Sequence, residues 1–146
     1  MPNFAARPNV GRRILHPTKT MEQEKKNILV AEDNDSNYVL MTYILRNNYR
    51  YARAHNGREA VEAVQAGDID MVLMDLNMPV MNGLEAARII STEYPHIPVI
   101  AITANAFEAD RQRARDAGCA GFLTKPVNSQ QCLEMIKQLL QKSDNN

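Results

Sequence analysis

Four strongly apolar segments of this chain each end at polar residues, and this repeated pattern constrains the fold more than any other feature. Segments that are apolar on both faces predict buried strands of a parallel sheet. The segments are 28–31 before Glu32 and Asp33, 71–74 before Asp75, 99–102 before Thr103, and 122–123 before Thr124 and Lys125. The intervals from Asp33 to Asp75, to Thr103 and to Lys125 are 42, 28 and 22 residues, which leaves room for helices between the strands.

The full pattern predicts an α/β fold in which strands and helices alternate. We expect strands at 27–31, 50–54, 70–74, 99–102 and 121–123, and the weak apolar alternation of 50–54 favours an edge position. We expect helices at 35–47, 58–66, around 84–90, at 106–117 and at 129–141. Short crossovers of one hand then imply a doubly wound, five-stranded parallel sheet with helices on both faces.

Two of the expected helices differ in how they should pack. The helix at 35–47 has Asp35 or Ser36 as its N-cap, and we expect its apolar side chains to face the core. These side chains are Val39, Leu40, Tyr43 and Ile44. The helix at 106–117 has no large aliphatic side chain beyond Phe107. Because one large buried side chain contributes only about 1.5–3 kcal/mol, we expect this helix to dock weakly and to move.

Length and composition predict one domain with a tail. The chain has 146 residues, of which 45% are hydrophobic and 23% charged. We expect a flexible basic tail at 1–26, a folded domain at 27–141 and a disordered end at 142–146. The tail carries six Lys and Arg against two Glu, but it has no periodicity, so we assign it no function and expect no direct nucleic-acid partner.

The lengths of the apolar segments and the spacing of the two cysteines indicate in which cellular compartment the protein acts. No segment is long enough to span a bilayer, and no signal peptide is visible, so we expect a cytoplasmic protein without a membrane partner. Cys119 and Cys132 have no metal-ligand spacing, and we expect both to be reduced.

Three carboxylates are expected to meet at one edge of the sheet, because ligands of such sheets bind beyond the carboxyl ends of the strands. Glu32, Asp33 and Asp75 would repel one another without compensation. A hard divalent cation with oxygen ligands resolves this repulsion, and Mg²⁺ suits a shallow site. Asp33 and Asp75 are the expected direct ligands, with Glu32 bound directly or through water and the Asn77 carbonyl completing the shell.

The same edge has the groups that phosphoryl transfer requires. Asp75 follows a rigid strand, and a carboxylate beside a metal ion and an ammonium group can attack phosphorus. Lys125 provides the ammonium group, and Pro126 biases it towards extended geometry. Thr103 can donate its hydroxyl to a phosphoryl oxygen after transfer. Read alone, Thr103 and Lys125 are equally consistent with ordinary strand-end and surface roles.

Four segments together resemble the motifs of response-regulator receiver domains. They are 30–37 (VAEDNDSN), 73–83 (LMDLNMPVMNG), 102–106 (ITANA) and 122–126 (FLTKP), and the resemblance covers residues 27–141 with every motif in order. The Asn-rich start of the first helix and the TANAF segment are similar to receivers of hybrid sensor histidine kinases. The chain either stands alone or is part of such a larger kinase.

The resemblance implies a flavodoxin-like fold with strand order 2-1-3-4-5 and a cis bond between Lys125 and Pro126. It implies Mg²⁺-dependent transfer of a phosphoryl group to Asp75 from the phosphohistidine of a sensor histidine kinase or a histidine phosphotransfer protein. Slow self-hydrolysis of the acyl phosphate is also implied, so the protein is a switch in a two-component phosphorelay rather than an enzyme. Glu32 stands where an aspartate is commoner, and its longer side chain should still serve the metal.

Phosphorylation is expected to change one face of the domain. Thr103 should turn towards the phosphoryl group and vacate space that Phe122 can enter, although Phe122 is as readily an ordinary core residue. The output face would comprise the helix at 106–117, the strand at 121–123 and the helix at 129–141, and a homodimer through it is an open alternative. Asn77 and Asn105 would position or exclude the hydrolytic water.

Two other functions remain as alternatives. Asp75 and Asn77 would fit the nucleophile motif of a haloacid-dehalogenase-like phosphohydrolase, but such enzymes place the nucleophile after the first strand and carry a cap insertion. A flavodoxin-like binding module without phosphorylation is disfavoured because Asp33, Asp75, Thr103 and Lys125 are all present.

Overall fold

Five parallel strands form the centre of the molecule in the computed structural model, which describes residues 24–144. The strands are β1 (Asn27–Ala31), β2 (Arg50–Ala54), β3 (Met71–Asp75), β4 (Val99–Thr103) and β5 (Gly121–Thr124). The helices are α2 (Asp35–Leu45), α3 (Gly57–Ala66), α4 (Gly83–Glu93), α5 (Glu108–Asp116) and α6 (Ser129–Asp144). The strand order is β2-β1-β3-β4-β5, which confirms the predicted fold and the edge position of β2.

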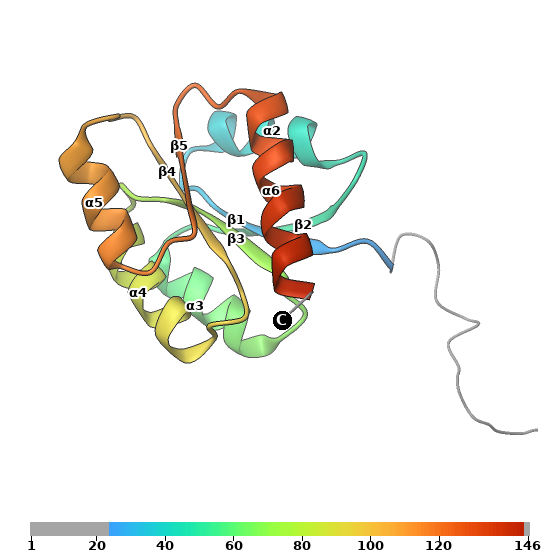
Figure 1. The fold of residues 1–146 in the computed structure, drawn as a ribbon, viewed down its shortest axis with the longest axis horizontal. Coiled ribbons are helices and arrows are strands. Elements are labelled where there is room, and N and C mark those ends of the chain that lie inside the picture. The colour runs from blue at the N-terminus through green and yellow to red at the C-terminus, as the bar shows by residue number, and fades with distance from the viewer. Residues whose placement is uncertain (1–23, 145–146) are drawn as a thin grey trace, which may run out of the picture.

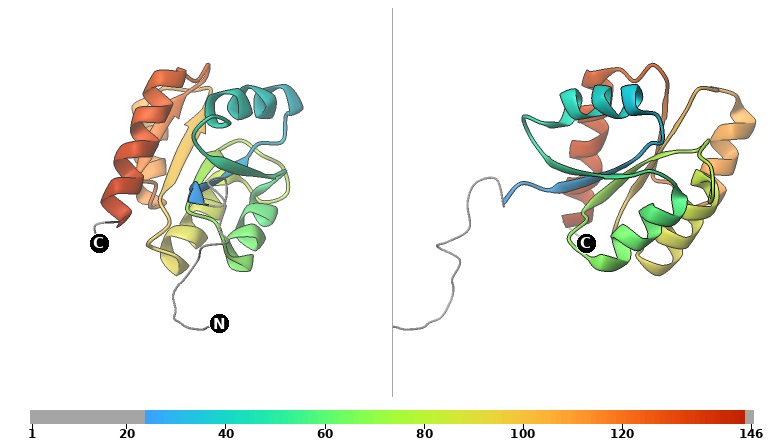
Figure 2. Two further views of the ribbon diagram at one scale, coloured as in Figure 1. Left: turned by 90° about the vertical axis from the view of Figure 1, so that its right-hand side faces the viewer. Right: turned by 180° about the vertical axis from the view of Figure 1, so that it is seen from behind.

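Helices cover both faces of this sheet in three layers (Figure 1; Figure 2). One face carries α2 and α6, whose buried side chains pack against Ile28 and Leu73. The other face carries α3 and α4, which pack against Leu29 and Val72, with α5 beside them near β5. The central strands β1 and β3 are therefore covered on both sides, and the ends of these two strands are held rigidly.

Four of the described helices begin with an asparagine cap at the carboxyl edge of the sheet. The side chains of Asn34, Asn56, Asn82 and Asn128 each accept a hydrogen bond from the backbone N–H three residues later. The N-cap of α2 is thus Asn34, so the predicted caps Asp35 and Ser36 were wrong. The positive ends of α2, α3 and α4 all lie at one edge, which favours negative charge there.

The packing of α2 differs from the prediction. Met41 and Leu45 are buried, whereas Val39, Leu40 and Tyr43 are 47%, 61% and 57% exposed. The predicted apolar stripe was therefore wrong for three of its four members. Nearly every residue from 38 to 45 is apolar, so periodicity alone does not select the buried face. The consequence is an apolar surface on α2 that no other described element covers.

The helix α5 has few apolar contacts, as predicted, but Phe107 does not anchor it. Phe107 is the N-cap residue and is 70% exposed, and Ala114 is the buried residue of the helix. The helix is shorter than the expected 106–117 and is followed by Gly118, whose φ is +92°. That α5 moves stays a prediction.

The ends of the described chain differ partly from the expected bounds. Helix α6 continues to Asp144, so residues 142–144 are helical and the expected end at 141 was too early. Residues 1–23, most of the predicted tail, lie outside the described residues, as do residues 145–146. Of the helices within 24–144, none combines the length and apolar character that crossing a bilayer requires.

Both cysteines are free thiols. Cys132 is on α6 and is fully buried against the sheet, while Cys119, between α5 and β5 in the sequence, is partly buried. Burial raises the pKa of each thiol to about 11, so both are protonated and weakly reactive at neutral pH.

Candidate functional site

The predicted site residues gather at the carboxyl edge of the sheet. Glu32 follows β1 and Asp75 ends β3, and these strands are neighbours with Ala31 opposite Met74. Thr103 ends the next strand, β4, where it is only 2% exposed, and Lys125 follows β5. Parallel pairing therefore brings together residues that are distant in the sequence.

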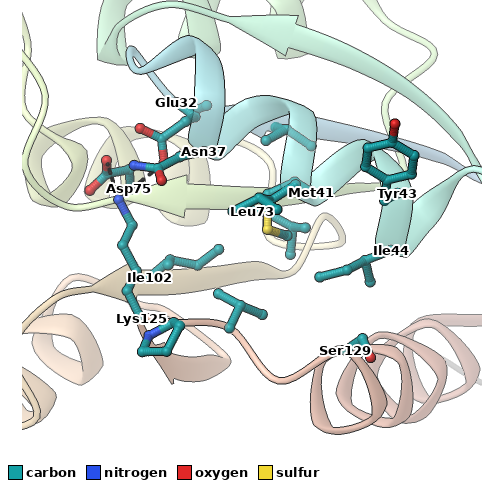
Figure 3. A pocket seen from close by; sticks show the side chains of 15 residues that line it. Glu32, Asn37, Met41, Tyr43, Ile44, Leu73, Asp75, Ile102, Lys125 and Ser129 are labelled. Atoms are coloured by element: carbon teal, nitrogen blue, oxygen red, sulfur yellow. Dashed lines mark hydrogen bonds and ion pairs between the residues drawn. The ribbon is translucent and has the colours of Figure 1, made fainter.

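The carboxylates of Glu32, Asp33 and Asp75 form one cluster, in which one oxygen of each lies within 4.8 Å of the others. Glu32 and Asp75 are buried, at 4% exposure each, whereas Asp33 is exposed to solvent. The Lys125 ammonium lies between the two buried groups, with Nζ 3.1 Å from Glu32 Oε1 and 3.1 Å from Asp75 Oδ2 (Figure 3). Lys125 compensates only part of the negative charge.

The electrostatics of the cluster favour a further cation. Burial raises the pKa of Glu32, and the negative charge of Asp75 adds to this shift despite hydrogen bonds from Asn34 and Lys125. Burial alone would lower the pKa of Lys125, but its contacts with Glu32 and Asp75 outweigh burial and raise it. Lys125 is therefore a fixed positive charge, while ionising Glu32 has an energetic cost that a metal ion would offset.

The same local contact orients three of the site side chains. In each case the donor is the backbone N–H of the residue two positions later. Asn34 donates to Glu32 Oε2 (3.2 Å), Asn77 donates to Asp75 Oδ1 (3.0 Å), and Asn105 donates to Thr103 Oγ1 (3.2 Å). Each contact holds a functional oxygen at the start of the loop after its strand.

Close packing fixes the loop after Asp75. A Cβ on Gly83 would lie 2.2 Å from the Asp75 carbonyl oxygen, so only glycine allows α4 to begin this near to β3. Gly57 is equally confined, because its Cβ would lie 2.2 Å from the Met81 carbonyl oxygen, which accepts a hydrogen bond from the Gly57 N–H. The starts of α3 and α4 therefore hold the loop from both sides.

An apolar groove of about 640 Å³ leads away from the carboxylates between α2 and the start of α6. Figure 3 shows Glu32, Asp75 and Lys125 at one end of this groove and Tyr43, Ile44 and Ser129 at the other. The exposed Leu40 also lines the groove. The site is thus open to a partner along α2.

The structure brings together Glu32, Asp33, Asp75 and Lys125, and it places Thr103 at the adjacent strand end. Asn77 contributes its backbone N–H to Asp75, and the ligand role of its carbonyl stays a prediction. The bond between Lys125 and Pro126 is cis, as expected.

Two arginines near the site were not predicted. Arg53 of β2 contacts the loop after β1, and Arg111 of α5 stacks on Phe122. The sequence signal that could have found Arg53 was the weak apolar alternation of residues 50–54. In a strand there, the charged side chain of Arg53 points towards one face of the sheet. Nothing in the sequence pairs Arg111 with Phe122.

The family model for the response regulator receiver domain matches residues 28–137. The chain belongs to this family. A relative from Brucella anthropi, the polar-differentiation response regulator DivK, is 35% identical over 118 residues, covering 79% of this chain and 96% of that protein. The receiver domain described here is therefore a phosphoacceptor signalling module of two-component systems, which decides against the phosphohydrolase alternative.

Two solved structures are similar in fold and sequence. One is the co-crystal structure of the Saccharomyces cerevisiae histidine phosphotransfer protein Ypd1 with the receiver domain of Ssk1, with 32% identity, a TM-score of 0.74, and coverage of 79% of this chain and 88% of that chain. The other is the receiver domain of the sensor histidine kinase PA1611 from Pseudomonas aeruginosa, which has a magnesium ion in its active-site cleft. Its identity is 31%, its TM-score 0.74, and it covers 80% of this chain and 98% of that chain.

Proposed function

We propose that Asp75 is the phosphoacceptor of this receiver domain. A carboxylate oxygen of Asp75 attacks the phosphorus of a phosphohistidine, an O–P bond forms as the P–N bond breaks, and the leaving imidazole takes up a proton. The proposal is supported chiefly by the position of Asp75, which is buried, fixed on a central strand and in contact with the Lys125 ammonium. Its carboxylate lines one end of the groove along α2.

The donor set fits Mg²⁺, because three carboxylates offer oxygen atoms within 4.8 Å of one another. Asp33 and Asp75 would hold the ion directly, Glu32 directly or through water, and the Asn77 carbonyl would complete the shell. When bound, Mg²⁺ would neutralise charge on the transferring phosphoryl group. The relative PA1611, which has magnesium in its cleft, supports this assignment.

Lys125 and Thr103 would act on the phosphoryl oxygens. The Lys125 ammonium now pairs with Asp75 and Glu32 and would turn to the added charge. Thr103 Oγ1 would donate to another phosphoryl oxygen. Asn77 and Asn105 would position or exclude water and set the rate of self-hydrolysis, in which water attacks phosphorus and restores the carboxylate.

The output of the switch would be a change around Phe122. As Thr103 turns, Phe122 would move inward and away from Arg111, which stacks on its ring in this structure, and α5 would then be free to shift. The face comprising α5, β5 and α6 would bind the downstream target, and a homodimer through this face is part of the proposal. Such a shift draws on about 1–3 kcal/mol of coupling between site and surface.

A histidine phosphotransfer protein or a sensor histidine kinase would dock on α2, in the cytoplasm. The exposed Val39, Leu40 and Tyr43 offer an apolar surface, and Leu40 and Tyr43 line the groove that leads to Asp75. The complex of Ypd1 with the Ssk1 receiver shows that a relative pairs with this class of partner.

The test is phosphorylation by acetyl phosphate with Mg²⁺. The parent should gain one acid-labile, hydroxylamine-sensitive phosphoryl group, and Asp75→Asn should gain none while its amide spectrum stays that of a folded domain. Asp68→Asn is the matched control, since Asp68 pairs with Arg50 on an exposed part of the fold away from the carboxylate cluster. Full labelling of Asp75→Asn would refute the assignment.

A further inference from the structure

Arg53 of β2 contacts three residues in two neighbouring parts of the fold beside the carboxylates. Its Nε donates to the Glu32 carbonyl oxygen at 3.1 Å, and its Nη1 pairs with Asp35 Oδ1 at 2.9 Å. Its guanidinium lies over the ring of Tyr38, 4.6 Å from the centroid. One side chain thus connects β2 to the end of β1 and to the first turn of α2.

We propose that Arg53 is a positioning residue for the metal site, so this inference rests on the Mg²⁺ site of the proposed function. The Glu32 N–H donates to the Ala54 carbonyl oxygen at 3.0 Å, and the Glu32 carbonyl accepts from Arg53. Both peptide groups of Glu32 are therefore tied to β2. The backbone torsions of Glu32 determine where the Glu32 and Asp33 carboxylates point, and Arg53 holds one of the two contacts that fix these torsions.

A purely structural role would not require this side chain. Arg53 is 17% exposed, and its Nη2 is buried without a hydrogen-bond partner among the described residues. Burying an N–H without a partner is unfavourable, and an apolar side chain stacked on Tyr38 would avoid it. The directed Nε–H, which an apolar residue lacks, is what reaches Glu32.

The charge of Arg53 and its geometry predict opposite effects on metal affinity. As a positive charge near the carboxylates, Arg53 repels Mg²⁺, so its removal would tighten binding if only charge mattered. As a support for the loop at Glu32 and Asp33, its removal would weaken binding. The sign of the change therefore separates the two roles.

The experiment measures the Mg²⁺ dissociation constant of the metal-free chain by calorimetry, and follows the amides of residues 32–34 and 75–77. Arg53→Met should weaken binding on the order of ten-fold, since groups that orient metal ligands have effects of this size. Arg53→Lys keeps the positive charge but lacks the planar guanidinium fork, so this variant should also bind Mg²⁺ more weakly than the parent. The lysine variant also decides the question if Arg53→Met fails to fold.

Arg50→Met is the matched control. Arg50 lies on the same strand, its Nε donates to the Lys25 carbonyl oxygen and its guanidinium pairs with Asp68, but it is at the opposite end of β2. Its Mg²⁺ affinity should equal that of the parent. Unchanged or tighter binding in the folded Arg53 variants would overturn the proposal. Absence of Mg²⁺ binding in the parent would instead refute the metal site itself.

Discussion

The Arg111 guanidinium lies over the Phe122 ring, with its central carbon 4.7 Å from the ring centroid. Phe122 is on β5 and Arg111 is on α5. This contact therefore connects α5, the described helix with the fewest buried apolar side chains, to the sheet. Within α5 the buried residue is Ala114. The stacking therefore holds Phe122 and α5 in a common arrangement.

Arg111→Ala should release this arrangement. Loss of a cation–π contact of about 0.5–1 kcal/mol shifts an equilibrium roughly two- to five-fold. The unphosphorylated variant should show ring signals of Phe122 and amide shifts of α5 displaced towards those of the phosphorylated parent. The control is Arg113→Ala, which breaks an ion pair with Asp110 on the same helix. Spectra of Arg111→Ala identical to the parent's would disprove the coupling.

Leu40→Ser should impair transfer from a protein donor and spare transfer from acetyl phosphate. Leu40 is 61% exposed, so the fold loses little, whereas burying a leucine side chain in an interface is worth about 1.5–3 kcal/mol. We expect phosphotransfer from a histidine phosphotransfer protein to slow roughly five-fold or more. Tyr51→Ser is the control, because Tyr51 is an exposed apolar residue on β2. Equal slowing in both variants would argue against docking on α2.

Glu32→Gln should stabilise the metal-free domain at neutral pH. The pKa of Glu32 is raised from 4.5, chiefly by burial, so the folded state binds more protons than the unfolded state in the window just above 4.5. Stability from this group is present below that window and is lost as the pH rises through the folded pKa. Denaturant titrations in EDTA should show the advantage of the variant growing across the window.

Magnesium should reverse this order. Mg²⁺ binds the ionised cluster, so at ten times its dissociation constant it should stabilise the parent by about 1.4 kcal/mol. Glu32→Gln should gain less. If Glu32→Gln and the parent have the same free energy of unfolding in EDTA at every pH, the assigned cost of ionising Glu32 is wrong.

Gly83→Ala should destabilise the domain and disturb Asp75. The added Cβ would meet the Asp75 carbonyl oxygen at 2.2 Å, so α4 or the end of β3 must shift. Forced packing of this kind costs about 1–3 kcal/mol, measurable as a loss of unfolding free energy. Acetyl phosphate labelling should slow as well. Labelling at the parental rate despite lower stability would show that the shift is confined to α4.

The sheet and the acidic site could be predicted because their signals are local. Strands buried on both faces are apolar throughout, and the polar residue that ends each one is read directly from the sequence. The register of parallel strands then placed Glu32 beside Asp75. The motif order supplied the family, which the family model confirms.

The contacts that were missed depend on tertiary packing. Helix α2 is apolar around most of its circumference, so its buried face is decided by α6 and the sheet and not by its own periodicity. Phe107 is a large apolar residue of the kind that anchors a helix to a core, but it is the N-cap residue of α5 and is exposed to solvent. Arg53 reaches Glu32 only because β2 lies next to β1.

Because β1 and β3 lie between layers of helices, the rigid part of the fold, which holds Asp75, is separate from the part that we expect to move, which is α5. Asp75 ends β3, a central strand buried along its whole length, whereas α5 has one small methyl group, that of Ala114, in the interior. Chemical modification at the stiff centre can thus be converted into displacement at the periphery without opening the hydrophobic interior. A receiver built in this way can return to its resting shape as soon as the phosphate is lost.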